Sequence, residues 1–373
     1  MSDLHIGRRV NGFSMLEDQT HILRQILNVI DGEKPDAVLI AGDVYDKSIP
    51  SAEAVLKFDW FLNELNERQL QVFVISGNHD SPERIAFGNR LMGQSGVHMV
   101  PVYDGSAEAF TMSDAHGSVH IHMLPFLKPA VVREFLKDEV IESYTDAYRA
   151  AIARMDIRPD ERNVLVAHAF VTKAQVSGSE DISVGGADSV DGSVFDAFDY
   201  VALGHLHRPQ NVCSARIRYC GTPLKYDLSE MTQQKSVTVV DLGEKGELDI
   251  HEVPLKPLRE MRALRGTYME LTARKNYEGT DVTDYLHITL TDEDDIPDAL
   301  NRMRSIYPNI MRLDYDNRRT RSAGELIVSD DVPQLDPMTL FSDFYEQQNG
   351  QPMSDAQRKF VAELIEQIWE GDK

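Results

Sequence analysis

The first two-thirds of the chain repeat one local pattern, in which a short apolar run ends at a small polar cluster. Four such runs cover residues 37–41, 72–76, 164–167 and 200–203, and Asp, Asn or His follows each within two positions. The runs are rich in Val, Ile and Leu and do not alternate with polar residues. This pattern is typical of β-strands that are buried on both faces, so we expect four central strands.

Segments with helical spacing flank the first of these strands. Apolar residues recur every three or four positions between residues 22 and 30, and again between residues 55 and 65, which fits amphipathic helices. Strands that alternate with helices predict a layered α/β fold. In such folds ligands gather at the carboxyl ends of the strands, and the polar clusters lie at those ends.

The pattern changes at residues 253–257, where two prolines favour a linker or an edge over the interior of an element. An alternating strand at 285–290 follows, and then a helix that begins near Asp298 and a strand at 310–313. These elements predict a small β-α-β unit.

The last segment carries two amphipathic helices. Apolar residues recur at helical spacing over 340–345 and over 360–369, and a capping-box pattern at 354–357 precedes the second set. Two short helices cannot bury such stripes against each other alone, so they need the rest of this chain or another protein. The domains that we predict are 1–253, 254–331 and 332–373.

Composition narrows the class of protein. With 38 Lys and Arg against 61 Asp and Glu, the 373-residue chain has a formal net charge of −23. Overall charge therefore argues against a protein that coats nucleic acid. No apolar run is long enough to span a membrane, and two cysteines cannot form a disulfide framework, so we expect a cytoplasmic protein. Basic residues still flank the polar clusters: Arg8, Arg9, Lys47, Arg84 and Arg208.

Together the polar clusters have the composition of a metal site. Carboxylate, amide oxygen and imidazole form a mixed ligand set that suits Mn²⁺, Fe or Zn²⁺. Seven ligands are too many for one catalytic ion with an open position, but they suit two ions that share a bridging carboxylate. A single His beside an apolar strand is more often an ordinary core residue. The clusters taken together, in this order and each at the end of a strand, instead indicate a metal site. The candidate ligands are Asp3, His5, Asp43, Asn78, His168, His205 and His207.

The order of these clusters resembles a known superfamily, the calcineurin-like metallophosphoesterases. The similarity lies in five motifs: Asp-x-His at 3–5, Gly-Asp at 42–43, Gly-Asn-His-Asp at 77–80, the lone His168 and Gly-His-x-His at 204–207. Within the superfamily, the residues around these motifs resemble the SbcD family, the nuclease subunits of bacterial SbcCD complexes. The stretches 219–226 and 254–259 are also similar to that family, and the resemblance covers nearly the whole chain.

This resemblance implies an α/β fold: a β-sandwich flanked by helices, with a small α+β capping domain and a C-terminal helical pair. It also implies two divalent metal ions, for which we expect Mn²⁺ with Mg²⁺ as the alternative. Carried over by motif, Asp43 would bridge the two ions. One ion would be held by Asp3, His5 and His207, and the other by Asn78, His168 and His205.

The resemblance further implies a DNA nuclease that acts in DNA repair, recombination and replication. The implied activities are a 3′→5′ exonuclease on duplex ends and an endonuclease on single-stranded or hairpin DNA. The implied partner is SbcC, an ATP-binding protein with long coiled coils, in an assembly that contains two copies of each chain. Residues 332–373 would dock on SbcC, and their packing on this chain's own domains is the alternative.

Two further side chains are assigned to catalysis. His79 follows a metal ligand directly, so we expect it to stabilise the transition-state charge or to protonate the leaving oxygen. Its alternative role is to orient a ligand. Asp46 follows the bridging Asp43 by three positions and either touches the leaving group or fixes the loop. We expect Asp80 to orient His79.

Two other classes of function compete with a nuclease. The same metals would serve a phosphatase or a cyclic-nucleotide phosphodiesterase on small substrates, although the extra segments after residue 253 argue against it. A non-catalytic scaffold that kept the fold ranks last, because all seven ligand positions are filled.

One feature departs from the pattern. The other clusters follow an apolar strand, whereas Asp3 is preceded only by Met1 and Ser2. Because the loss of a central strand would expose sheet edges, we expect the sequence to be truncated at its N-terminus. Asp3 and His5 would then be poorly held, and reading the upstream genomic DNA tests this expectation.

Overall fold

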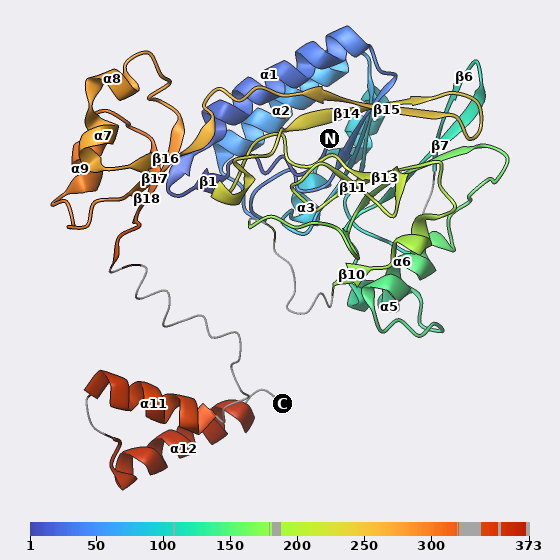
Figure 1. Cartoon of the computed structure of the whole chain (residues 1–373). Coiled ribbons are helices and arrows are strands. Elements are labelled where there is room, and N and C mark those ends of the chain that lie inside the picture. The colour runs from blue at the N-terminus through green and yellow to red at the C-terminus, as the bar shows by residue number, and fades with distance from the viewer. Residues whose placement is uncertain are drawn as a thin grey trace. The chain divides into compact units, whose positions relative to one another are not determined.

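The computed structural model describes residues 1–106, 109–178, 180, 188–318, 320, 337–349 and 352–370 (Figure 1). The chain divides into two compact units, one of residues 1–290 and 296–314 and one of residues 291–295 and 315–373. Among the described residues, no helix combines the length and the apolar character that a membrane crossing requires.

The first unit is built on two β-sheets that pack face to face. A parallel sheet has the order β3-β4-β5, formed by Ala37–Ala41, Gln71–Ile75 and Val97–Val100. A mixed sheet of six strands has the order β12-β13-β11-β8-β7-β6. Its strands are Gln210–Val212, Ser214–Tyr219, Tyr200–Gly204, Arg162–His168, Gly117–Leu124 and Phe110–Asp114. The four predicted central strands are therefore confirmed as β3, β4, β8 and β11.

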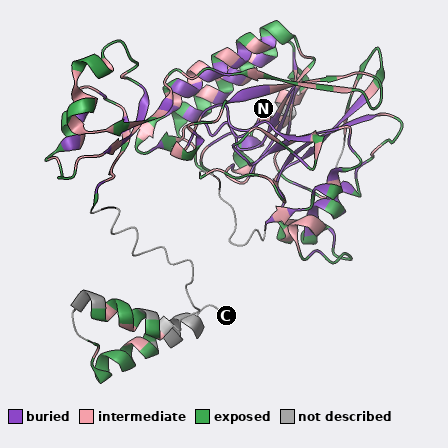
Figure 2. Cartoon of the chain, viewed as in Figure 1, coloured by how far each residue is buried: buried purple, intermediate pink, exposed green. Residues whose placement is uncertain are grey.

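Strand β4 shows why these apolar runs do not alternate. Successive side chains of a strand point to opposite faces of the sheet. Val72 and Val74 face the helices, in the same apolar cluster as Ile22 of α1. Phe73 and Ile75 face the other sheet, where they pack in a cluster with Val166. Both faces are apolar because the sheet lies between a helical layer and a second sheet. Figure 2 shows that the strands of the sandwich are largely buried.

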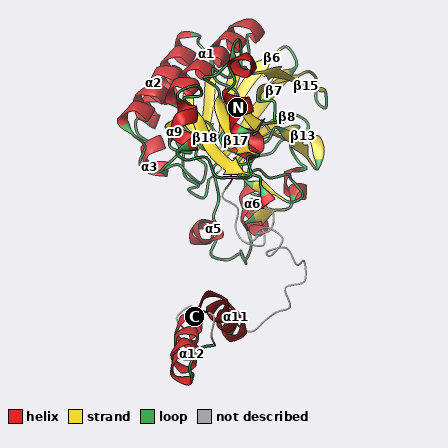
Figure 3. Cartoon of the chain, turned by 60° about the vertical axis from the view of Figure 1, so that its left-hand side comes forward, coloured by secondary structure: helices red, strands yellow, loops and turns green. Residues whose placement is uncertain are grey.

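Helices cover both outer faces of the sandwich. On the three-stranded sheet lie α1 (Leu16–Glu33) and α2 (Ala52–Glu67), whose first turn is capped by the Ser51 side chain. Figure 3 shows these two helices along one side of the strands. On the six-stranded sheet lie α5 (Pro129–Phe135) and α6 (Tyr144–Ile152), which pack in one cluster with β8 and β11. The predicted β-sandwich flanked by helices is thus confirmed.

Shorter elements complete the sandwich and its loops. The hairpin of β14 and β15 joins Ser236–Leu242 to Leu248–Pro254. The other short strands are β1 Arg9–Val10, β2 Phe13–Ser14, β9 Phe170–Val171 and β10 Ser189–Val190. The short helices are α3 Pro82–Ile85, α4 Asn89–Met92, η1 Gly93–Ser95, η3 Gly192–Phe195 and η4 Leu228–Glu230.

A small α+β segment follows the sandwich. Its three-stranded sheet has the order β16-β17-β18, with strands Met261–Gly266, Tyr285–Leu290 and Ile310–Tyr315. Its helices are α7 Tyr268–Thr272, α8 Arg274–Tyr277 and α9 Ala299–Arg304. The predicted strand–helix–strand pattern is confirmed as β17, α9 and β18. The predicted domain boundaries at 253 and 331 stay predictions, and residue 331 lies outside the described residues.

The second unit contains two helices, α11 (Pro337–Asn349) and α12 (Asp355–Glu370). Ser354 and Gln357 form the predicted capping box, since each side chain hydrogen-bonds the other's backbone N–H. Phe344 of α11 and Phe360 of α12 remain 59% and 62% exposed. The side chains of Ile365, Ile368 and Trp369, which complete the predicted stripe, lie outside the described residues.

Candidate metal centre

The first polar cluster lies beside the carboxyl end of β3. The N–H of Asp3 donates to the carbonyl of Gly42 at 3.0 Å, and that of His5 donates to the carbonyl of Asp43 at 3.0 Å. Ile6 then pairs with Tyr45 in a parallel bridge. This ladder brings the first two candidate ligands next to the third, although they lie far from it in the sequence.

Unusual backbone conformations aim several of these side chains inward. Asp3, His5, Asp43 and His205 have φ angles of 52°, 43°, 50° and 109°. Such angles are uncommon outside glycine and cost of the order of 1–3 kcal/mol each. Strain of this kind concentrates at functional sites, where the surrounding structure holds it in place.

The structure brings Asp3, His5 and His207 into one group, whose ligand atoms all lie within 4.8 Å of one another. The Nε2 atoms of His5 and His207 are 3.2 Å apart. Oδ1 of Asp3 accepts a hydrogen bond from the backbone of His205 at 2.9 Å. Its buried Oδ2 has no hydrogen-bond partner within the described part of the chain. This group is the one that the resemblance assigns to the first metal ion.

A second group surrounds the amide of Asn78. Its Oδ1 lies 2.9 Å from Nε2 of His168 and 2.9 Å from Nδ1 of His205. Nδ1 of His168 is 2.9 Å from the carbonyl of Ala41 and donates to it, so the lone pair of Nε2 faces the amide oxygen. Two electron-pair donors that face each other suit a shared cation.

Asp43 lies between the two groups. Its Oδ2 is 3.7 Å from Nε2 of His5 and 3.5 Å from Nε2 of His168. Its Oδ1 accepts a hydrogen bond from the backbone N–H of His79 at 2.9 Å. One carboxylate thus faces imidazoles of both groups, which is the position that a bridging ligand requires.

Burial sets the protonation of the site. Desolvation lowers the pKa of His168 and of His205 to about 3, so both imidazoles are neutral and can bind a metal ion. Desolvation also raises the pKa of Asp3, with the charge of Asp43 as the next cause, and it raises the pKa of Asp43. Two buried carboxylates among neutral imidazoles lack compensating charge, and a divalent cation would supply it.

His79 and Asp46 lie at the edge of this cluster. The side chain of His79 is 20% exposed, and its ring meets that of His5 edge to face at a centroid distance of 4.8 Å. Asp46 accepts a hydrogen bond from Arg8 at 3.0 Å, and its Oδ1 is 3.9 Å from Nδ1 of His5. These contacts favour the second of its two expected roles, fixing the loop.

The expectation for Asp80 was wrong. Its carboxylate accepts hydrogen bonds from the backbone N–H groups of Val44, Tyr45 and Gly77 at 3.1, 2.9 and 2.9 Å, rather than orienting the His79 side chain. A buried carboxylate bonds the backbone donors that surround it, and here these donors belong to two neighbouring loops. Asp80 therefore ties together the loops that carry Asp43 and Asn78.

The sequence did not reveal the groups that orient His207. Oε1 of Glu230 lies 3.4 Å from Nδ1 of His207, and Lys235 Nζ lies 2.7 Å from Oε2 of Glu230. Lys235 also donates to the carbonyl of His207 at 2.9 Å. Burial alone would raise the pKa of Glu230, but the hydrogen bond with His207 and the charge of Lys235 hold it at about 2. Both residues lie well beyond the last motif, in no recognisable pattern.

Gln19 and Tyr226 hold the first cluster in a similar way. The Gln19 amide donates to the carbonyl of His5 at 2.7 Å and to the hydroxyl of Tyr226 at 2.9 Å. That hydroxyl donates to the carbonyl of Leu4 at 2.7 Å. In the structure Asp3 and His5 are fully buried and hydrogen-bonded along their backbone.

Two glycines allow the strand ends to approach so closely. A Cβ on Gly77 would run into the carboxylate of Asp43, and one on Gly204 would run into the carbonyl of Ala41. The sequence motifs Gly-Asn-His-Asp and Gly-His-x-His therefore begin with glycine for a steric reason.

Comparisons with known proteins agree with this geometry. The profile described as calcineurin-like phosphoesterase matches residues 1–209, and one described as type 5 capsule protein repressor C-terminal domain matches residues 257–349. The chain is 32% identical over 371 residues to the D subunit of the SbcCD nuclease of Staphylococcus epidermidis, covering 98% of this chain and 96% of the relative. For the corresponding protein of Staphylococcus saprophyticus the identity is 31% over 375 residues, covering 99% and 97%.

A solved structure, that of TT1561 from Thermus thermophilus, is similar to 63% of this chain and to 94% of its own length. The TM-score of this likeness is 0.36, and the sequence identity is 12%. The fold, the site and the matching profile instead define this protein as a calcineurin-like phosphoesterase, a class of metal-dependent hydrolases. The near-full-length relatives narrow the class further, and the chain belongs to the family of SbcCD nuclease D subunits.

Replacement of Glu230 by Gln tests the contact with His207. The Gln amide keeps an oxygen acceptor but lacks the negative charge, so it holds Nδ1 of His207 less strongly and leaves Lys235 without its ion pair. Loss of such a partner commonly costs about ten- to a hundredfold in metal affinity. We expect Mn²⁺ titration by calorimetry to show a loss of this size. The exposed Glu244→Gln is the matched control, and equal affinities for both variants would contradict the role of Glu230.

Proposed function

We propose that this chain is a two-metal phosphodiesterase that cleaves DNA, with 3′→5′ exonuclease activity on duplex ends and endonuclease activity on single-stranded or hairpin DNA. The observation that carries the proposal is the pair of ligand groups on either side of Asp43, with His79 at the accessible edge. The names of the relatives support a nuclease. We propose Mn²⁺ as the resident ion and Mg²⁺ as the alternative.

The candidate ligands would form two metal-binding groups. Asp3, His5 and His207 would hold one divalent ion, Asn78, His168 and His205 would hold the other, and Asp43 would contribute its carboxylate to both groups. Bound divalent ions at such a site polarise the phosphodiester and make a bound water acidic. Because His168 and His205 are buried and neutral, no proton has to leave these two imidazoles when an ion binds.

His79 is placed to act on the substrate without binding the ions. Its backbone is anchored to Asp43, while its ring lies at the accessible edge of the site. From there it would donate to a phosphate oxygen or protonate the leaving oxygen. Asp46 would hold Arg8, whose guanidinium lies 5.4 Å from the centre of the Tyr226 ring.

The overall charge of −23 is compatible with a DNA substrate. Electrostatic binding depends on the local potential, and bound divalent cations offset the carboxylates of the site. Arg9, Lys47, Arg84 and Arg208 are at least partly exposed in the structure and flank the metal motifs in sequence. We propose that they contact phosphates beside the scissile bond.

We also propose an ATP-binding partner of the SbcC type, contacted by α11 and α12. The exposed Phe344 and Phe360 support this role, because large apolar side chains on amphipathic helices mark a surface that binds a partner. Two copies of each chain would form the assembly. Cys213 and Cys220 are free thiols, which agrees with a reducing cytoplasm as its location.

A substrate comparison tests the nuclease. The purified chain should degrade an end-labelled DNA duplex in Mn²⁺, label should be released from 3′ ends, and chelation of the metal should abolish the reaction. A chromogenic phosphomonoester should be hydrolysed far more slowly. Faster hydrolysis of the phosphomonoester or of a cyclic nucleotide would instead support the small-substrate function.

His79→Asn separates catalysis from metal binding. Loss of a general acid commonly costs about 10²- to 10⁴-fold in rate, so we expect kcat to fall by this factor while the Mn²⁺ content stays unchanged. His168→Asn should instead lower the bound Mn²⁺, as measured by atomic emission. Loss of metal from the His79 variant would assign this residue to the ligands.

Removal of residues 332–373 tests the docking role. We expect the truncated chain to lose co-purification with an SbcC partner while keeping Mn²⁺-dependent nuclease activity. Phe344→Ser combined with Phe360→Ser should weaken co-purification strongly, whereas the exposed Lys359→Ser should not. Undiminished binding by the truncated chain would refute this role.

A further inference from the structure

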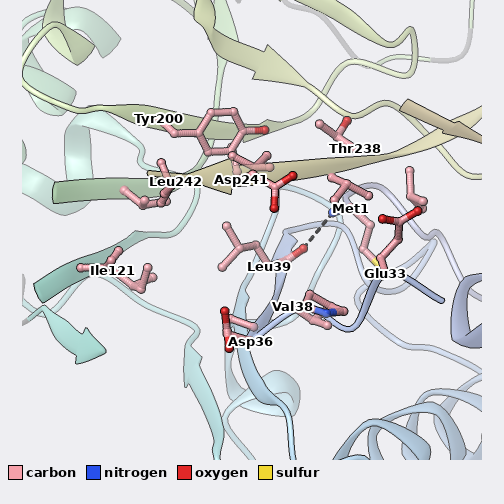
Figure 4. A pocket seen from close by; sticks show the side chains of 18 of the residues that line it. Met1, Glu33, Asp36, Val38, Leu39, Ile121, Tyr200, Thr238, Asp241 and Leu242 are labelled. Carbon is pink, nitrogen blue, oxygen red and sulfur yellow. Dashed lines mark hydrogen bonds between the residues drawn. The ribbon is translucent and has the colours of Figure 1, made fainter. Parts of the chain in front are cut away.

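The first polar cluster, around residues 3–5, is held from two sides. On one side the chain pairs with β3, beginning with the hydrogen bond of 2.8 Å from the amino group of Met1 to the carbonyl of Leu39 (Figure 4). On the other side, the buried side chains of Gln19 and Tyr226 donate to the carbonyls of the cluster. Whatever fixes these two side chains therefore also fixes the cluster.

Gln19 uses both ends of its amide on this side. Its Nε2 donates to the carbonyl of His5 at 2.7 Å and to the hydroxyl of Tyr226 at 2.9 Å. Its Oε1 accepts a hydrogen bond from the backbone N–H of Gly7 at 3.0 Å. Because Gln19 belongs to the first turn of α1, a displacement of that turn would pull on the backbone on both sides of the candidate ligand His5.

The preceding residue, Asp18, bonds a different part of the molecule. Consecutive side chains of a helix point in directions about 100° apart, so Asp18 faces residues 259–290, which we call the cap segment. Its Oδ2 accepts hydrogen bonds from Nη1 of Arg259 and from the hydroxyl of Tyr285, both at 2.8 Å. Asp18 is fully buried, and a buried carboxylate depends on such partners for its charge. The first turn of α1 is therefore tied to the cap segment.

A second connection has the same design. Lys225 forms an ion pair with Glu260 of the cap segment, directly before β16. The next residue, Tyr226, is buried, and its hydroxyl donates to the carbonyl of Leu4 at 2.7 Å. The two connections meet at the hydrogen bond between Gln19 and the Tyr226 hydroxyl. In each, one residue bonds the cap segment and its neighbour bonds the first polar cluster.

We propose that Asp18 and Lys225 are positioning residues, through which the cap segment holds the group of Asp3, His5 and His207 in the geometry that binds a divalent ion. This inference rests on the two-ion site proposed above. A movement of the cap segment away from α1 lowers the affinity of this group for its ion. Because such coupling is reciprocal, an ion bound there stabilises the docked cap segment.

The two ligand groups differ in how far they depend on this support. Asp3 and His5 have φ angles of 52° and 43°, and a strained backbone persists only where its surroundings hold it. His168 is instead the last residue of β8, and His205 directly follows β11, so the six-stranded sheet positions both. Loss of the connections should therefore weaken the first ion and spare the second.

Tyr285→Phe and Asp18→Asn in the full chain test the first connection. The former removes one hydroxyl and the latter one charge, and neither changes the size of the side chain much. Loss of a group that supports metal ligands costs about tenfold or more in affinity, so we expect calorimetry to show a loss of about this size for one of two Mn²⁺ ions. The matched control is Glu17→Gln, since Glu17 pairs with the same Arg259 but is exposed.

Three further measurements assign the effect. The loss should persist in a His168→Asn background, where only the first ion titrates, and vanish in a His5→Asn background. In the metal-free chain, amide exchange of residues 1–10 should become about threefold faster in both variants and stay unchanged in the control, as measured by mass spectrometry. Lys225→Met should have the same effects, and Lys225→Arg, which keeps the charge, should not.

Several outcomes would overturn the proposal. One is a Mn²⁺ affinity and an exchange rate in the Tyr285 and Asp18 variants equal to those of the Glu17 control. Another is a loss confined to the second ion, or a loss of both ions together, which would show general unfolding. A wild-type chain that binds no Mn²⁺ would overturn the two-ion site itself. That failure is distinct, because it appears before any substitution and leaves the exchange of the metal-free chain to report on the connections.

Discussion

The structure depends on the close approach of strand ends around one buried carboxylate, that of Asp43. Its two oxygens face the backbone of His79 and the imidazoles of His5 and His168. So many polar groups share a buried space only if a cation compensates their charge or if each finds a hydrogen-bond partner. The glycines, the positive φ angles and the buried neutral imidazoles all serve this arrangement.

A layer of supporting groups surrounds that carboxylate, and each forms hydrogen bonds with backbone groups or with a ring nitrogen of a candidate ligand. Asp80 bonds the loops that follow β3 and β4, Gln19 and Tyr226 bond the first cluster, and Glu230 faces His207. The side chains that make these contacts are all buried. They explain how loops that follow different strands hold the candidate ligands close to one another without regular secondary structure.

The distribution of charge follows the same logic. Acidic residues outnumber basic ones over the whole chain, but the site itself combines two buried carboxylates with neutral imidazoles. The exposed Arg9, Arg84 and Arg208 flank its motifs in the sequence. A protein of this kind would bind a phosphate through divalent metal ions and a few basic side chains, not through the charge of its whole surface. Phe344 of α11 and Phe360 of α12, in the other compact unit, are exposed.

The sequence by itself determined the four central strands, the flanking helices and the set of candidate ligands. Burial on both faces produces an unbroken apolar run, and ligand chemistry requires Asp, Asn or His directly after that run, so both features are visible in consecutive residues. Only the tertiary structure decided that Asp80 ties two loops and that Glu230 and Lys235 orient His207. These contacts join residues far apart in the chain, and no local pattern records a hydrogen bond made across a fold.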